Sequence, residues 1–218
     1  MKFGVVRFPG SCDEVDALNA CRRFARAELL WHGDRDLKGV DAVVVPGGFS
    51  YGDYLRAGAL ARFSPVMEAV ADFARAGGPV LGICNGFQVL CEARLLPGAL
   101  LVNEELRFLC RQVDVRVEDP NTAFTRACAR GERLSVPVKH MTGRFHSPDV
   151  EALEKSGQVV FRYETGWNPN GSQNDIAGVR NEAGNVVGLM PHPEHAVDLL
   201  TGSEDGGKLF ESAVLQPA

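Results

Sequence analysis

Residues 79–88 read PVLGICNGFQ, a short apolar run followed by a cysteine that stands between two glycines. The run predicts one buried strand, and the residues after Cys84 continue in a pattern typical of a helix. A strand that turns sharply into a helix thrusts out the residue at the turn, and Gly-x-Cys-x-Gly is the cysteine counterpart of the serine nucleophile elbow. Side chains at Gly82 and Gly86 would collide in such a turn. Cys84 is therefore the candidate nucleophile, and the N-terminus of the following helix favours its thiolate form.

Two apolar runs earlier in the chain also end in glycine-containing turns. Residues 3–8 lead to Pro9-Gly10-Ser11, and residues 40–45 lead to Pro46-Gly47-Gly48. Helical spacing of apolar residues follows each of them. Strands that alternate with helices imply parallel units, in which sites lie beyond the carboxyl ends of the strands. Two local signals mark the predicted starts of these helices: a capping box at Ser11 and Glu14, and an N-cap with a first-turn proline at Ser64-Pro65.

The second half of the chain has a different pattern. Apolar residues alternate with charged ones at 113–117, as in a half-buried antiparallel strand, and further candidate strands precede a closing helix at 205–213. Turn signals separate them, of which residues 182–185 form a good hairpin turn. The predicted fold class is α/β: a single-domain open, mostly parallel sheet with helices on both faces and an antiparallel extension in the second half. We expect one domain over residues 1–218.

Composition limits the function classes. The 218 residues are 45% apolar and 23% charged, with a net charge of −5 that argues against nucleic-acid or anionic-membrane partners. No segment approaches the length of a membrane helix, and the first apolar run is too short for a signal peptide, so we expect a cytoplasmic protein. The six cysteines form no C-x-x-C pair, and no metal site is predicted.

The candidate base lies in Met190-Pro191-His192-Pro193-Glu194. A cysteine nucleophile needs a base, and the base needs a group that holds its tautomer. The flanking prolines predict an extended segment, in which residues two apart face the same way, so Glu194 can approach the ring of His192. The alternative is a proline-rich surface loop with a solvated histidine and glutamate.

Acyl transfer also requires donors for the developing oxyanion. The backbone N–H of Asn85 follows the nucleophile directly, and Gly48 follows the end of a neighbouring strand. Glycine at positions 47 and 48 permits close backbone approach to a ligand, although a tight turn alone would explain both residues.

Taken in order, Pro-Gly-Gly, Gly-x-Cys-x-Gly-x-Gln and His-Pro-Glu resemble the class I (triad) glutamine amidotransferases. The match is closest to the glutaminase subunits of phosphoribosylformylglycinamidine synthase. It rests on residues 46–58, 82–88, 168–172 and 190–194 and extends over almost the whole chain.

The resemblance implies a glutaminase with Cys84, His192 and Glu194 as catalytic residues. Gly48 and Asn85 would supply the oxyanion hole, and Gly47 and Gln88 would help to bind the glutamine substrate. Ammonia would pass to a larger synthase subunit that uses ATP and Mg²⁺, and a small third subunit would bridge the two. No cofactor is implied in this chain. Where the family often has a His-Gly-Glu-Gly loop, residues 140–145 read HMTGRF, and we assign them no substrate-binding role.

Three other functions remain open. A glutaminase for another acceptor synthase would share the same triad. A cysteine peptidase on a related scaffold would share the elbow but would not need Gln88 or the segment at residues 50–56, which is either a contact with the synthase or a loop packed on itself. A non-catalytic binding or stress protein with Cys84 as a redox sensor would leave the His-Pro-Glu segment unexplained.

Overall fold

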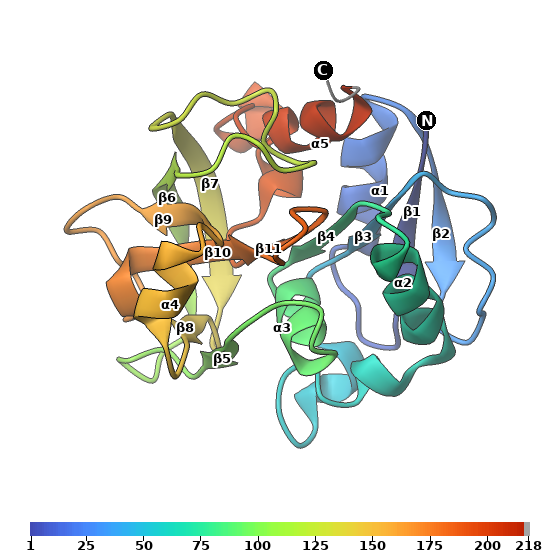
Figure 1. The fold of residues 1–218 in the computed structure, drawn as a ribbon, viewed down its shortest axis with the longest axis horizontal. Coiled ribbons are helices and arrows are strands. Elements are labelled where there is room, and N and C mark those ends of the chain that lie inside the picture. Colours follow the sequence, from blue (N-terminus) through green and yellow to red (C-terminus); the bar gives the residue numbers. More distant parts are fainter. Residues whose placement is uncertain (216–218) are drawn as a thin grey trace.

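The computed structural model describes residues 1–215. Its main feature is one sheet of nine strands in the order β2-β1-β3-β4-β11-β10-β9-β6-β7, which runs across the molecule with helices packed on it (Figure 1). The strands from β2 to β11 pair in parallel, and those from β11 to β7 pair antiparallel. The predicted fold class is confirmed, including the antiparallel extension.

The parallel half consists of five strands and four helices. The strands are β1 (Lys2–Arg7), β2 (Arg26–Trp31), β3 (Ala42–Val45), β4 (Val80–Ile83) and β11 (Val186–Leu189). The helices are α1 (Glu14–Arg22), α2 (Pro65–Arg75), α3 (Asn85–Glu92) and α5 (Gly207–Val214). Each strand except β2 is almost completely buried, which explains why these segments read as continuous apolar runs.

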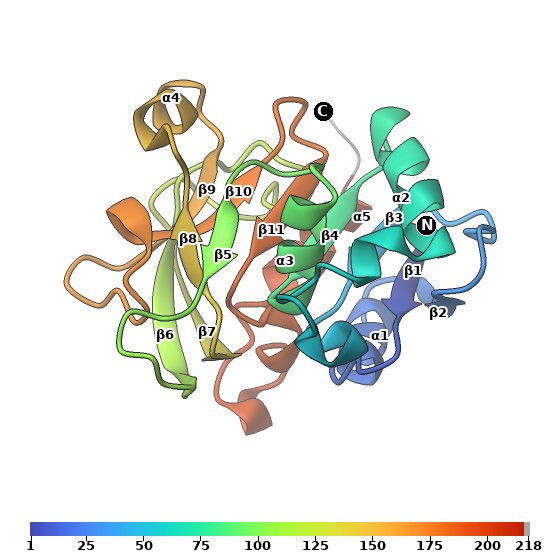
Figure 2. The same cartoon turned by 90° about the horizontal axis from the view of Figure 1, so that it is seen from below.

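Helices cover both faces of the parallel half. The chain moves from β1 to β2 in one direction along the sheet and from β3 to β4 in the other. Because parallel crossovers are right-handed, α1 and α2 must then lie on opposite faces, as Figure 2 shows. The helix α5 lies beside α1, where Phe24 and Phe210 stack with ring centroids 6.3 Å apart.

Two predictions about helix starts have different outcomes. Ser64 is the N-cap of α2 and Pro65 its first residue, as expected. The capping box at Ser11 is wrong, because the N-cap of α1 is Asp13. The Ser11 hydroxyl instead accepts a hydrogen bond from the N–H of Phe8 and closes the turn after β1. This shift leaves the Asp13 carboxylate free to serve the site described below.

The antiparallel half carries β6 (Leu109–Val117), β7 (Arg133–His140), β9 (Val159–Tyr163) and β10 (Ile176–Arg180). A separate two-stranded sheet of β5 (Ala99–Leu101) and β8 (Arg144–His146), together with the short helix α4 (Val150–Lys155), covers it. Short 3₁₀ turns complete the elements: η1 (Ser50–Asp53), η2 (Ala61–Phe63), η3 (Gln173–Asp175), η4 (Pro193–His195) and η5 (Leu199–Thr201).

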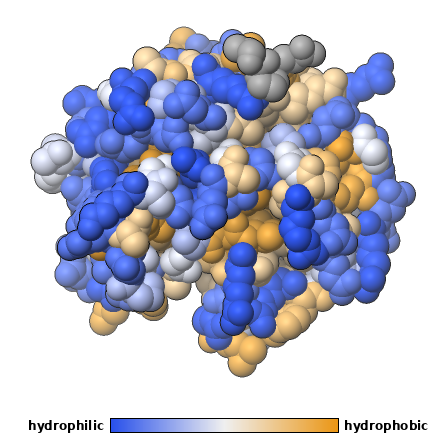
Figure 3. All heavy atoms as spheres, viewed as in Figure 1, coloured by the Kyte–Doolittle hydropathy of each residue, from blue (hydrophilic) through white to orange (hydrophobic). Residues whose placement is uncertain are grey.

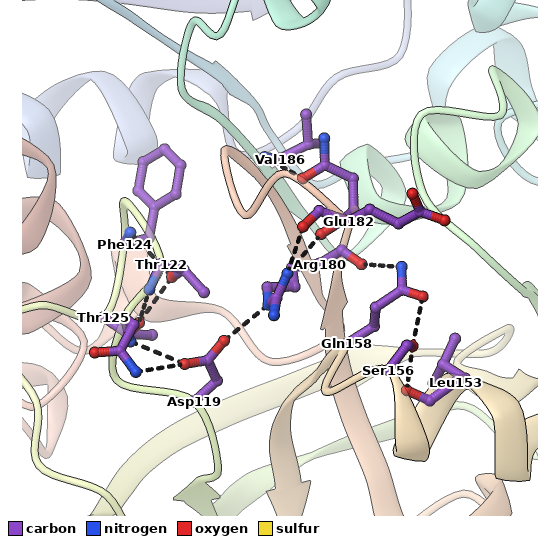
Figure 4. A network of polar contacts seen from close by, with 12 residues as sticks. Asp119, Thr122, Phe124, Thr125, Leu153, Ser156, Gln158, Arg180, Glu182 and Val186 are labelled. Atoms are coloured by element: carbon purple, nitrogen blue, oxygen red, sulfur yellow. Dashed lines mark hydrogen bonds and ion pairs between the residues drawn. The ribbon is translucent and has the colours of Figure 1, made fainter.

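The hairpin of β10 and β11 joins the two halves. Its turn is the one predicted at residues 182–185, and β11 pairs in parallel with β4 so that Leu189 lies opposite Ile83. The turn of the hairpin is fixed by Arg180, which pairs with Asp119 at 2.7 Å and donates to the carbonyls of Asn181 and Glu182 (Figure 4). The parallel pairing with β4 holds the end of β11 beside the end of β4, although about 100 residues separate the two strands.

The surface shows where the two halves meet. Hydrophilic side chains dominate the face in Figure 3 and surround a central apolar region. Leu95 and Leu96, which follow α3, line a surface pocket together with Val186 of β11. Among residues 1–215, no helix has both the length and the apolar character that a bilayer crossing requires.

Candidate active site

The turn between β4 and α3 presents Cys84 in a strained backbone conformation. Its φ of 50° and ψ of −104° lie outside the regions that non-glycine residues favour. A Cβ at Gly82 would lie 2.9 Å from the backbone of Gly86, and a Cβ at Gly86 would overlap the carbonyl oxygen of Val45 at the end of β3. Glycine is thus required on both sides of Cys84, and the predicted elbow is present.

A second glycine turn follows β3 and lies against the first. Gly48 has a φ of +139°, and a Cβ there would lie 2.6 Å from the backbone nitrogen of Cys12. Gly48 lines the pocket at Cys84, and its N–H donates no hydrogen bond within residues 1–215. The N–H of Asn85 begins α3, where backbone donors lack a partner inside the helix. Both N–H groups are therefore available to a ligand.

Gly47 has a different local role from Gly48. A Cβ at this position would lie 2.7 Å from Cε1 of His192 and would strike the carboxylate of Asp13. The carbonyl of Gly47 accepts the N–H groups of Cys12 and Asp13. Glycine here lets the imidazole ring approach the turn, while contact with a substrate stays a prediction.

His192 and Glu194 follow the end of β11. The ring of His192 is fully buried and donates its Nδ1 proton to Oε1 of Glu194 at 2.6 Å. The backbone of His192 donates to the carbonyl of Pro137 in β7. Our prediction that the segment stays extended through Glu194 is wrong, because Pro193 begins the turn η4. Proline is favoured at the first position of a helical turn, and the turn brings the glutamate back onto the ring.

The side chains of Cys84 and His192 line one pocket. Nε2 of His192 makes no hydrogen bond of regular geometry within residues 1–215, and the thiol of Cys84 lies within interaction range of the ring. Burial disfavours the imidazolium, but the negative charges of Glu194 and Cys84 outweigh burial and raise the pKa of His192 to about 10. The geometry thus brings together a thiol, an imidazole and a carboxylate in the order that nucleophilic catalysis needs.

A family model described as a CobB/CobQ-like glutamine amidotransferase domain matches residues 1–214. The chain belongs to the class I glutamine amidotransferases. It is 60% identical over 217 residues to phosphoribosylformylglycinamidine synthase subunit PurQ of Frankia casuarinae, with 98% of this chain and 93% of the relative covered. The protein of the same name from Rubrobacter xylanophilus is 58% identical, with 98% of both chains covered.

Solved structures show the same amidotransferase fold. A chain in the structure of PurLQS from Thermotoga maritima superposes with a TM-score of 0.91 at 43% identity, covering 98% of this chain and 97% of that one. The glutaminase domain of Trypanosoma brucei CTPS superposes with a TM-score of 0.64 at 16% identity, covering 98% and 92%. The second likeness concerns the fold alone.

Asp13 lines the same pocket as Cys84 and His192, although the sequence did not single it out. Its carboxylate is buried, lies 3.7 Å from Nδ1 of His192, accepts from Lys139 and lies 3.3 Å from Nε2 of His195. Burial opposes ionisation of Asp13, but His195, His192 and Lys139 outweigh it and hold the pKa of Asp13 well below its usual range. A carboxylate directly after the turn that follows β1 was the available signal, because the carboxyl ends of parallel strands meet at one edge.

Asp13, His192, Glu194 and His195 place one nitrogen or oxygen each within 4.8 Å of one another. Such a set can hold a metal ion in other proteins. Here the ammonium group of Lys139 already forms an ion pair with the carboxylate of Asp13. The cations that balance these carboxylates are therefore side chains of the protein itself.

The end of β7 and the loop after it form another wall of this pocket. His140, Met141 and Thr142 line it, although we assigned residues 140–145 no substrate-binding role from the sequence. Gln88 donates its amide to the carbonyl of Thr142 and accepts from Asn85 at 2.8 Å. Gln88 thus links α3 to this loop, and its predicted contact with a substrate stays a prediction.

Buried asparagines hold the same loop from behind. Asn103 donates to the carbonyls of Arg107 and His140, each at 2.9 Å, and accepts from the N–H of Gly143. Because its amide nitrogen is the donor, its oxygen must accept from Nδ1 of His140 at 3.1 Å. The Nε2 atom of His140 is then an unpartnered acceptor within residues 1–215.

The Asn-Pro-Asn-Gly-Ser segment at residues 168–172 reinforces this support. Asn170 donates to the carbonyl of Gly143 at 2.8 Å, and Ser172 accepts from the N–H of Phe145 at 3.0 Å. Asn168 accepts from three successive backbone N–H groups and so winds the segment on itself. The motif is therefore a brace for the pocket wall in this fold.

Proposed function

We propose that the chain is the glutaminase subunit of phosphoribosylformylglycinamidine synthase and serves purine biosynthesis. Full-length relatives of this name at 58–60% identity support the assignment. The observation that carries the chemistry is the buried His192, held by Glu194 and directed at Cys84. The reaction is hydrolysis of glutamine to glutamate and ammonia.

In the first step the Cys84 thiolate attacks the side-chain carbonyl carbon of glutamine. The N–H groups of Gly48 and Asn85 stabilise the oxyanion, a contribution of about 10²–10³ in rate for each donor. The imidazolium of His192 then protonates the departing nitrogen, ammonia leaves, and a γ-glutamyl thioester remains on Cys84. His192 is thereby neutral and ready to act as a base.

In the second step water attacks the thioester. His192 accepts a proton from that water, the same two N–H groups stabilise the second oxyanion, and cleavage of the C–S bond releases glutamate and the thiolate. Glu194 stays ionised and keeps the ring in the tautomer that directs Nε2 at the sulfur. The chain needs no cofactor for this sequence of steps.

The released ammonia requires an acceptor site on another chain. We assign the ATP- and Mg²⁺-dependent step to a larger synthase subunit and a bridging role to a small third subunit. This agrees with the name PurLQS of the Thermotoga maritima structure. Because free ammonia would be lost, we expect the isolated subunit to hydrolyse glutamine slowly, and a full rate without partners would contradict that gating.

Reconstitution with synthase and bridging subunits tests the function. Glutamate release and amidine synthesis are measured with formylglycinamide ribonucleotide and with acceptors of other amidotransferases. Cys84→Ala should abolish glutamine-dependent synthesis and leave ammonia-dependent synthesis intact, with Cys91→Ala on α3 as the matched control. Loss of both activities in Cys84→Ala would mean that Cys84 holds the structure. If a different synthase stimulated glutamate release instead, the proposed acceptor would be wrong. Peptide cleavage without partners would favour a peptidase.

A further inference from the structure

Two carboxylates, those of Asp13 and Asp53, line the pocket at Cys84, and a third, that of Glu194, lies behind the ring of His192. Two of the three are neutralised by cations of the protein. Asp13 pairs with Lys139 and His195, and Glu194 pairs with His192. The remaining one, Asp53, has a single hydrogen bond, from the neutral amide of Asn85 at 3.3 Å. Asp53 is thus the carboxylate of this pocket that lacks a positive partner within residues 1–215.

We propose that Asp53 binds the α-ammonium group of the glutamine substrate. The inference rests on the proposed glutaminase function and deepens it, because it assigns a substrate contact that decides specificity. An ammonium group offers three donors and a full charge, and a carboxylate in a partly desolvated wall is its strongest neutral-pH acceptor.

The position of Asp53 fits this role. Asn85, whose side chain holds the Asp53 carboxylate, directly follows Cys84 and supplies the backbone N–H of the proposed oxyanion hole. The carboxylate and the reacting atoms therefore lie on one wall. Asn85 also accepts from the N–H of Ser50 at 3.1 Å, which fixes the loop that carries Asp53.

The loop is held in a strained conformation around this carboxylate. Tyr51, Asp53 and Leu55 all have positive φ, at 54°, 53° and 68°, a conformation that costs energy for residues with a Cβ. Clusters of such residues occur where the surroundings determine the backbone for a functional reason. Here the strain directs one acidic side chain into the pocket while Tyr54 and Leu55 face solvent.

The charge state of Asp53 agrees with a missing cation. Burial raises the pKa of Asp53 to about 6, although the hydrogen bond from Asn85 opposes the rise. The other titratable groups that line the pocket are Cys12, Asp13, Cys84, Lys139, His140 and His192. The two cations among them, on Lys139 and His192, are engaged by Asp13 and Glu194. A bound ammonium would supply the partner that Asp53 lacks.

A cycle of two enzymes and two substrates tests the contact in the reconstituted complex. Wild type and Asp53→Asn are assayed for ammonia release from glutamine and from glutaramic acid, which has the side-chain amide but no α-amino group. For glutamine we expect kcat/KM to fall about 10- to 100-fold in Asp53→Asn, mainly through KM, because a charge-assisted contact is lost. For glutaramic acid we expect a change of less than about threefold, because the lost contact does not exist.

Asp72→Asn on α2 is the matched control, since it removes an exposed carboxylate that pairs with Arg75 on the surface. Equal losses with both substrates in Asp53→Asn would overturn the proposal and show that Asp53 only positions Asn85. A urea-denaturation midpoint close to that of wild type verifies that the variant is folded. A wild-type complex that releases no ammonia from glutamine would instead refute the proposed function itself.

Discussion

The two halves of the molecule present their active-site groups by different physical means. In the parallel half, Cys84, Gly48 and His192 lie within three residues of a strand end, and close backbone packing fixes the turns at Cys84 and Gly48. In the antiparallel half, the wall at residues 140–142 is held by amide side chains such as Asn103 and Asn170. The first arrangement tolerates no extra atom, whereas the second depends on every donor meeting its acceptor. The predicted costs of substitution differ accordingly.

The largest effect should come from Gly86→Ala in the parallel half. The added methyl group would overlap the carbonyl oxygen of Val45, a backbone atom of a buried strand that has no room to yield. We expect a loss of at least about 3 kcal/mol in the free energy of unfolding and no detectable glutaminase activity. Urea denaturation and ammonia release measure the two effects.

Gly131→Ala is the matched control, because its Cβ would meet open space and only the positive φ of 79° is unfavourable. That variant should lose about 1 kcal/mol and keep its activity. Equal stability losses at positions 86 and 131 would mean that backbone crowding does not fix the elbow.

The next largest effect concerns the tautomer of His192. Glu194→Gln keeps the shape of the side chain, but its amide can donate a hydrogen bond to Nδ1. The ring would then adopt the other tautomer, in which Nε2 carries the proton and cannot accept one from the thiol. By analogy with other triads, we expect kcat to fall about 10³- to 10⁴-fold with little change in KM.

His195→Gln serves as the control for Glu194→Gln, since this neighbouring ring is partly exposed and contacts Asp13 rather than the thiol. The expected loss is below about tenfold. If Glu194→Gln retained full activity, Glu194 would not orient the ring, and Asp13 at 3.7 Å would be the alternative.

These differences also explain what the sequence made predictable. Apolar runs that end in glycines identified β1, β3 and β4, and the local spacing of residues 82, 84 and 86 predicted the elbow. The partners of Cys84 followed from chemical need and from the family resemblance. The roles of Asp13, Lys139 and residues 140–142 were missed, because they depend on contacts of β7 with the segments that follow β1 and β11, which lie far from it in the chain. A hydrogen bond between buried amides leaves no periodic pattern in a sequence.

Asn103→Ala tests the antiparallel half in the same way. It would leave the N–H of Gly143 and the carbonyl of His140 without their buried partner. We expect a loss of about 2–3 kcal/mol in the free energy of unfolding, and a higher KM for glutamine because the pocket wall loosens. Gln112→Ala, which removes an exposed hydrogen bond to Ser135 in β7, should lose less than about 0.5 kcal/mol. A small loss at Asn103 would show that the loop does not depend on this amide.

The smallest effect is a pH dependence of stability that comes from His140. Burial, with a further contribution from the charge of His192, lowers the pKa of His140 to about 3 from 6.5. The unfolded chain therefore binds a proton that the folded chain rejects between these values. The stability contributed by neutral His140 is complete above 6.5 and is lost as the pH falls toward 3. Between roughly pH 7.5 and pH 5 the contribution of His140 to the free energy of unfolding should fall by about 2 kcal/mol, while His192 and Asp53, whose pKa values are raised, contribute in the opposite direction. Urea denaturation of wild type and variants at the two pH values measures the change in the free energy of unfolding.

His140→Gln cannot titrate, so its stability should fall by about 2 kcal/mol less than that of wild type over this interval. His146→Gln, at the exposed end of β8, should keep the wild-type slope. Equal slopes for wild type and His140→Gln would mean that the ring already accepts a proton in the fold. Nε2 would then carry the added proton, while Nδ1 would still donate to the amide oxygen of Asn103.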